Sequence, residues 1–129
     1  MRQQPARILI VEDEEGLRRG LTVFLEDDGF EVIAAATAEE GLRLVIQCLP
    51  DAAIVDIRLP GMDGNTFIEQ AHELHGGIGF IVYTGSVSYK PSLMMSSLGI
   101  KENHVFKKPL IDMSVLVEAV REQLASGGR

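Results

Sequence analysis

Residues 53–64 read Ala53-Ile54-Val55-Asp56-Ile57-Arg58-Leu59-Pro60-Gly61-Met62-Asp63-Gly64 and decide the predicted fold. The apolar run 52–55 is typical of a strand that is buried on both faces in the middle of a parallel sheet. It stops at Asp56, and the proline and glycines that follow predict a turn. We therefore expect Asp56 at the carboxyl end of a central strand, the edge where open α/β sheets bind ligands. Taken alone, such an aspartate is more often a surface residue that merely ends a strand.

A second acidic cluster follows the first apolar run of the chain. Residues 7–11 predict a strand, and residues 12–15 directly after it are all acidic. If the two strands are parallel neighbours, Glu12, Asp13 and Asp56 meet at one edge of the sheet. Two carboxylates about 4 Å apart repel by about 4 kcal/mol at an effective dielectric constant of about 20, so a cation is needed between them. Oxygen ligands favour a hard divalent ion, with Mg²⁺ as the first choice and Mn²⁺ as the second. The two later acids, Glu14 and Glu15, suit the positive N-terminal end of the following helix.

Composition and charge limit the class of protein. The 129 residues are 46% hydrophobic, which is enough for one domain with a buried core. A net charge of −7 argues against direct contact with nucleic acid, which needs a basic face. No apolar run reaches the roughly 18 residues of a membrane span, and residues 8–11 are too short for a signal peptide, so we expect a cytoplasmic protein without membrane contact. Cys48 and the three histidines show no zinc spacing, and no organic cofactor is expected.

Strand and helix patterns alternate along the chain. The expected strands cover residues 7–11, 31–35, 52–55, 80–83 and 104–106. The expected helices cover residues of about 17–28, 38–49, 65–75, 91–98 and 112–124. This alternation predicts an α/β fold, a single-domain three-layer (βα)5 sandwich with a parallel five-stranded sheet in the flavodoxin-like order 2-1-3-4-5. Residues 1–6 are expected to be an N-terminal extension, 7–125 the domain, and 126–129 a tail or the start of a linker.

Local signals refine these helices. Gly29 is expected to take the left-handed conformation after the first helix, and Thr37 with Glu40 fits a capping box at the start of the second. Helical spacing predicts the apolar residues that face the sheet. They are Leu17, Leu21, Phe24 and Leu25 in the first helix, Leu42, Val45, Ile46 and Leu49 in the second, Phe67, Ile68, Ala71 and Leu74 in the third, and Met113, Leu116, Val117, Val120 and Leu124 in the last.

Four strand ends contribute side chains to one predicted cleft. They carry Glu12 and Asp13, then Asp56, then Thr84, and then Lys107 or Lys108. A carboxylate can attack phosphorus and form an acyl phosphate when a metal, an ammonium group and a hydroxyl neutralise the phosphoryl oxygens. We expect Asp56 to be the nucleophile and Glu12, Asp13 and Asp56 to hold the metal, with the backbone carbonyl of Arg58 as a further ligand. Thr84 and one lysine would bind phosphate oxygens, because alternation along a strand lets only one of the two lysines point into the cleft.

These motifs resemble the receiver domain of two-component response regulators, the chemotaxis-regulator-like family. The resemblance covers residues 7–124 and rests on four runs in the order of the family: Val11-Glu12-Asp13-Glu14, residues 56–64, Thr84-Gly85 and Lys108-Pro109. It implies a phosphoacceptor that takes a phosphoryl group from a sensor histidine kinase, a histidine phosphotransfer protein or a small phosphodonor. Such a protein is a signalling domain and not an enzyme, although it assists its own phosphorylation and autodephosphorylation.

The resemblance also implies partners and further roles. Phosphorylation would reorganise the face made by the fourth helix, fifth strand and fifth helix, which binds a downstream protein or output domain or forms a phosphorylation-dependent dimer. The lysine of the family directly precedes proline, which selects Lys108, with Lys107 as the adjacent alternative and a cis Lys108–Pro109 bond. Arg58 and Ser86 would tune dephosphorylation.

Two features depart from the family. Val105 stands where the family has an aromatic switch residue, so coupling of Thr84 to an aromatic is in question. The segment between Thr84 and Lys108 is longer than usual and contains Met94-Met95, a pair that we interpret as ordinary core.

Three other functions remain as alternatives. A pseudo-receiver would bind partners constitutively through its fourth and fifth helices, and Val105 keeps this hypothesis open. A hydrolase-type phosphatase would need a general acid two residues after its nucleophile, where Arg58 is poorly suited. A flavin-binding protein would need a phosphate-cradling loop after the first strand, where the acidic residues 12–15 would repel the phosphate.

Overall fold

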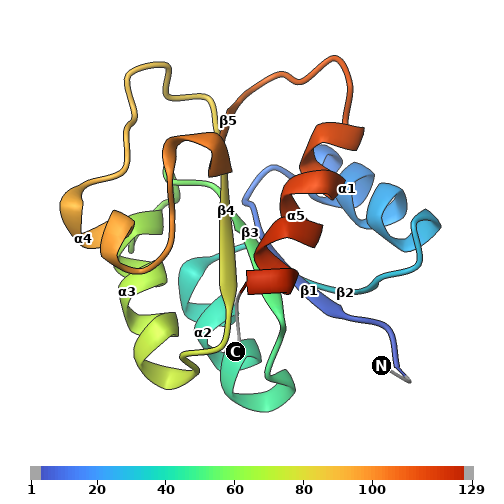
Figure 1. The fold of residues 1–129 in the computed structure, drawn as a ribbon, viewed down its shortest axis with the longest axis horizontal. Coiled ribbons are helices and arrows are strands. Elements are labelled where there is room, and N and C mark those ends of the chain that lie inside the picture. The colour runs from blue at the N-terminus through green and yellow to red at the C-terminus, as the bar shows by residue number, and fades with distance from the viewer. Residues whose placement is uncertain (1–3, 127–129) are drawn as a thin grey trace.

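Mainly apolar runs of three to six residues form the strands of one parallel sheet in the order β2-β1-β3-β4-β5 (Figure 1). The computed structural model describes residues 4–126; the first and last three residues, within the predicted extension and tail, lie outside the described residues. The strands are β1 (Arg7–Val11), β2 (Glu31–Ala35), β3 (Ala52–Val55), β4 (Gly79–Thr84) and β5 (Val105–Lys107). The helices are α1 (Glu15–Asp27), α2 (Ala38–Cys48), α3 (Gly64–Leu74), α4 (Leu93–Ser97) and α5 (Ser114–Ser126), and a 3-10 turn, Glu102–His104, precedes β5. The predicted fold class and strand order are confirmed.

The helices cover both faces of the sheet. Helices α1 and α5 lie on one face, and α2, α3 and α4 lie on the other (Figure 1). Alternation along β1 sends Ile8 and Ile10 into the core under α1 and α5, while Leu9 and Val11 pack under α2 and α3. Every residue of β3 and β4 is buried, as expected for the centre of a parallel sheet. Among residues 4–126, none of the helices has the length and apolar character needed to cross a bilayer.

Two predicted helix-end signals are present. Gly29 has a φ of +96° directly after α1, a conformation that glycine adopts without a steric penalty. Thr37 caps α2 by accepting a hydrogen bond from the Glu40 N–H at 3.1 Å. The Glu40 side chain returns a bond at 3.1 Å to the Ala36 N–H, one residue earlier than a regular capping box.

Part of the predicted helix faces was wrong. Four residues assigned to the core are exposed: Phe24, Ile46, Leu49 and Leu74. The buried residues of α2 are Ala38, Gly41 and Val45. The contact at Gly41 is tight, because a Cβ there would lie 2.8 Å from Phe67 Cε1 and 3.1 Å from Val11 Cγ2. Counting large apolar residues misses such a face, since small residues let the helix come closest.

Several predicted boundaries were also shifted. The fifth strand begins at Val105, and His104 belongs to the preceding 3-10 turn. The last helix begins two residues later than predicted, because the Asp112 side chain accepts hydrogen bonds from the N–H and hydroxyl of Ser114. Of the methionine pair interpreted as core, Met95 is buried but Met94 is 54% exposed.

A pair of helical glycines tests the packing of α2. We expect Gly41→Ala to lower the free energy of unfolding by about 1–3 kcal/mol, because the added methyl group overpacks the contact with Phe67. Gly20→Ala in α1 is the matched control: nothing lies within 4 Å of its Cβ position, so the better helix propensity should stabilise the protein by about 0.5–1 kcal/mol. Urea unfolding measures both, and a Gly41→Ala protein as stable as the Gly20→Ala protein would contradict this packing.

Candidate functional site

The register of β1 and β3 brings two acidic strand ends together. Val11 pairs with Val55, and the Asp56 N–H continues the ladder with a 3.0 Å hydrogen bond to the Val11 carbonyl. Glu12 and Asp56 therefore lie side by side, with exposed fractions of only 3% and 5%. Asp13 is exposed beside them, and carboxylate oxygens of all three acids lie within 4.8 Å of one another.

A single ammonium group joins the two buried carboxylates. Lys108 Nζ lies 2.8 Å from Glu12 Oε1 and 2.8 Å from Asp56 Oδ2. The Lys108 N–H donates to the Thr84 carbonyl at 2.9 Å, which extends the β4–β5 ladder by one residue and sets the side chain over the site. The predicted cis Lys108–Pro109 bond follows directly.

The adjacent lysine points away from the carboxylates. Lys107 Nζ donates hydrogen bonds to the backbone carbonyls of Ser86 at 2.9 Å and Tyr89 at 2.7 Å. Neighbouring residues of a strand point to opposite sides, so of the two candidates only Lys108 reaches Glu12 and Asp56.

The pKa shifts of Glu12 and Lys108 follow from burial and from the contact of one cation with two anions. Burial raises the pKa of Glu12 above its ordinary 4.5, although hydrogen bonds from Lys108 and the Glu14 N–H lower it. Burial alone would lower the pKa of Lys108, but its hydrogen bonds to Asp56 and Glu12 outweigh that cost and leave its pKa raised. The ammonium thus has two carboxylate partners, whereas Glu12 shares the Lys108 cation with Asp56.

Backbone groups fix the orientation of the Asp56 carboxylate. The Arg58 N–H donates to Asp56 Oδ1 at 3.1 Å, while Lys108 occupies Oδ2. The turn that follows requires glycine, because a Cβ on Gly64 would lie 2.5 Å from the Asp56 carbonyl oxygen and 2.7 Å from Ile57 Cα. The start of α3 therefore packs directly against the end of β3.

The hydroxyl at the end of β4 is fully buried. Thr84 has an exposed fraction of 0%, and its Oγ1 accepts a 3.2 Å hydrogen bond from the Ser86 N–H. Thr84 is the last residue of β4, which lies between β3 and β5, and Ser86 follows it in the chain by two residues. Thr84 and Ser86 are thus at the same edge of the sheet as the acids.

The donor set fits a hard divalent cation. Three carboxylates with oxygens inside 4.8 Å face one ammonium group, so the cluster keeps an excess of negative charge, and all of its ligand atoms are oxygen. The next acid serves the helix instead: Glu14 caps α1 by accepting hydrogen bonds from the Gly16 and Leu17 N–H groups. The role at the start of α1 that the sequence predicted for Glu14 is confirmed. Metal binding by Glu12, Asp13, Asp56 and the Arg58 carbonyl stays a prediction.

Sequence reasoning missed two contacts of this region. It assigned the lysine to phosphate oxygens only and did not foresee that Lys108 joins Glu12 to Asp56. It also gave no role to Tyr89, whose hydroxyl donates to Asn65 Oδ1 at 2.8 Å. The consecutive residues Lys107 and Lys108 were the signal in the sequence, because the lysine that faces away from the site needs other partners.

Comparisons with known proteins agree with this geometry. The model of the response regulator receiver domain family matches residues 8–121. A response regulator receiver domain protein (CheY-like) from Methanospirillum hungatei JF-1 is 34% identical, with a TM-score of 0.79 over 95% of each chain. The response regulator protein TrrA from Thermotoga maritima, solved in complex with Mg(2+)-BeF, is 25% identical, with a TM-score of 0.78 over 92% of this chain and 98% of that one.

Curated relatives are longer than this chain. The transcriptional regulatory protein GlrR of Escherichia coli (strain K12) is 28% identical over 124 residues, which are 96% of this chain but only 27% of GlrR. The chain thus resembles one part of that regulator.

The raised pKa of Glu12 predicts a pH-dependent cost to stability. Between the two pKa values, the Glu12 carboxyl is protonated in the folded protein and ionised in the unfolded protein. The protonated carboxyl therefore contributes to stability fully below the ordinary pKa of 4.5, and this contribution is lost as pH rises through the raised pKa of the folded state. We expect Glu12→Gln to raise the free energy of unfolding of the metal-free protein at neutral pH, with the difference vanishing below pH 4.5. Urea unfolding across this range measures the effect, and Glu118→Gln, an exposed position on α5, is the control. A less stable Glu12→Gln protein at neutral pH would contradict the prediction.

Proposed function

Because the chain belongs to the response regulator receiver domain family, we propose that it is a phosphoacceptor in a cytoplasmic two-component system or phosphorelay. Asp56 accepts a phosphoryl group from the phosphohistidine of a sensor histidine kinase or a histidine phosphotransfer protein. The observation that carries this proposal is the cluster of Glu12, Asp13 and Asp56 with the Lys108 ammonium 2.8 Å from Glu12 and Asp56. A nucleophile, an ion site and a cation for phosphoryl oxygens then stand at one sheet edge.

The chemistry is an in-line transfer to a carboxylate oxygen. One Oδ of Asp56 forms a bond to phosphorus while the P–N bond of phosphohistidine breaks, and the electron pair stays on the imidazole nitrogen. The Arg58 N–H holds Asp56 Oδ1, which orients the carboxylate before the reaction. Lys108 exchanges a carboxylate partner for a phosphoryl oxygen, and the Thr84 hydroxyl donates to another.

Glu12, Asp13 and Asp56, with the Arg58 carbonyl, would hold Mg²⁺ or Mn²⁺. When bound, the ion would neutralise the negative charge on the phosphoryl oxygens. The relative TrrA, solved in complex with Mg(2+)-BeF, supports the choice of ion. Arg58 and Ser86, two residues after the acceptor and the hydroxyl, tune the rate of autodephosphorylation.

The signal leaves the site through the strands that carry Thr84 and Lys108. Thr84 ends β4, which leads into α4, and Lys108 follows β5, which leads into α5. A change of partner at either residue therefore reaches the face made by α4, β5 and α5. We propose that this face contacts a downstream protein or output domain, or a second copy of the phosphorylated chain.

Phosphorylation at Asp56 is directly testable. Acetyl phosphate with Mg²⁺ is expected to add one phosphoryl group to the wild-type protein, observed as a mass increase of the intact chain. Asp56→Asn should abolish the labelling because it removes the nucleophilic oxygen. Asp27→Asn, an exposed position on α1, should label like the wild type. Labelling of the Asp56→Asn protein at the wild-type rate would rule out the assignment.

Metal binding separates the proposal from a pseudo-receiver that binds partners constitutively. We expect the wild-type protein to bind Mg²⁺ and Asp13→Asn to bind at least about tenfold more weakly, because an ion ligand is lost. Isothermal titration of the protein with MgCl₂ measures both affinities, again with Asp27→Asn as control. Absence of Mg²⁺ binding by the wild type would favour the pseudo-receiver.

A further inference from the structure

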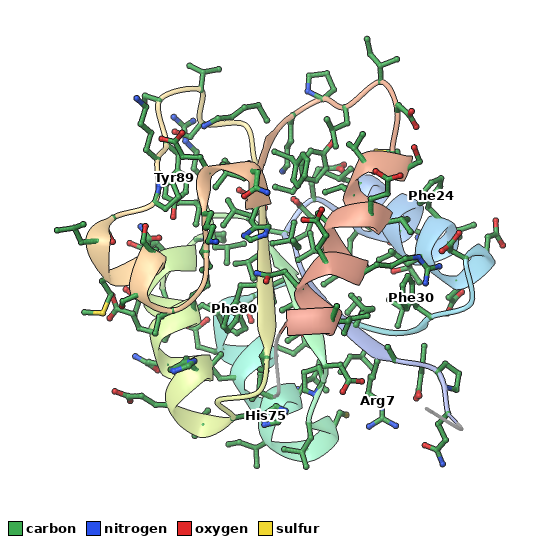
Figure 2. The ribbon with its side chains drawn as sticks, viewed as in Figure 1. Arg7, Phe24, Phe30, His75, Phe80 and Tyr89 are labelled. Atoms are coloured by element: carbon green, nitrogen blue, oxygen red, sulfur yellow. The ribbon has the colours of Figure 1, made fainter. Side chains whose placement is uncertain are left out.

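The connection between β4 and α4 is tied to two other elements. Figure 2 shows Tyr89 on this connection. Its hydroxyl donates to Asn65 Oδ1 in α3 at 2.8 Å. Lys107 of β5 donates to the carbonyls of Ser86 and Tyr89 at 2.9 and 2.7 Å, and its Nζ lies 5.7 Å from the centre of the Tyr89 ring. We call the side chains of Asn65, Tyr89 and Lys107, with the Ser86 carbonyl, the loop latch.

The loop latch is continuous with the candidate site. The Ser86 carbonyl is held by Lys107, while the N–H of the same residue donates to Thr84 Oγ1. At the other end, Asn65 follows Gly64, where an added Cβ would lie only 2.5 Å from the Asp56 carbonyl oxygen. The latch therefore joins the segment after Thr84 to the segment after Asp56.

The surroundings of Tyr89 leave room for movement. Val105, on β5, lines a cavity of about 200 Å³ together with Tyr89, Lys107 and Pro91. Beyond this cavity α4 is only five residues long and begins at Leu93, four residues after Tyr89. A displacement of Tyr89 is thus passed through a short connection to the start of α4.

We propose that the loop latch holds the Thr84–Ser86 segment in its resting position and that release of Tyr89 from Asn65 couples phosphorylation of Asp56 to α4. The coupling rests on the proposed function. For the Thr84 hydroxyl to turn toward a phosphoryl oxygen, its bond from the Ser86 N–H must change. Ser86 cannot move without altering its bond to Lys107, which also holds Tyr89. Tyr89 is accordingly a positioning residue, supplied by the connection rather than by β5, where Val105 stands.

The latch favours the resting loop, so weakening it increases the fraction of molecules with the segment released. Tyr89→Phe removes only the hydroxyl that reaches Asn65, and Asn65→Ala removes the acceptor. Each should speed phosphorylation by acetyl phosphate and Mg²⁺ about fivefold, the factor typical of one neutral hydrogen bond. The double variant should be no faster than either single variant, because both remove the same bond.

The experiment compares the initial phosphorylation rates of the wild type, the two single variants and the double variant. Asn103→Ala, at an exposed position in the 3-10 turn, is the matched control and should keep the wild-type rate. Hydrogen exchange of residues 85–92 in the unphosphorylated proteins gives a second readout, and Tyr89→Phe should accelerate it.

The outcomes distinguish the two proposals. Normal labelling of the wild type with unchanged rates in both single variants overturns the latch alone. Independent effects, with the double variant about 25-fold faster, also overturn it. A wild-type protein that gains no phosphoryl group overturns the proposed function, and the coupling with it, whatever the exchange rates are.

Discussion

The contact on which the site depends is the Lys108 ammonium between the carboxylates of Glu12 and Asp56, at 2.8 Å from each. Two buried carboxylates at adjacent strand ends repel each other, and removal from water adds to that cost. A cation from a third strand offsets both effects, which requires β1, β3 and β5 to end at one edge. The parallel sheet meets this requirement, because all of its strands point the same way.

The burial of Glu12 has a cost to the stability of the metal-free fold. Burial raises the pKa of Glu12, so at neutral pH its charged form is less stable in the fold than in water. A hydrophobic residue would suit the folded state better, but it would remove one of the oxygen ligands that we propose for the ion. Sites that bind a divalent ion commonly carry such a cost, because their clustered carboxylates lack a full set of cationic partners until the ion binds.

The two consecutive lysines bind different parts of the molecule, one the site and the other the neighbouring loop. Lys108 faces the acids, and Lys107 holds the carbonyls of Ser86 and Tyr89. Each lysine has its own aromatic neighbour: Lys107 Nζ lies 5.7 Å from the centre of the Tyr89 ring, and Lys108 Nζ lies 5.8 Å from that of Tyr83. Val105 lines the cavity beside Tyr89.

The order of strands and helices, the acidic strand ends and the turn after Asp56 were determined by sequence alone, because period, capping residues and glycine positions are local signals. Contacts between distant residues were decided only by the tertiary structure. The bridge from Lys108 to Glu12 and Asp56 depends on strand register, and the burial of Gly41 in place of Ile46 and Leu49 depends on how closely α2 approaches Phe67. Neither can be read from one segment, because each is set by the packing of several elements around the sheet.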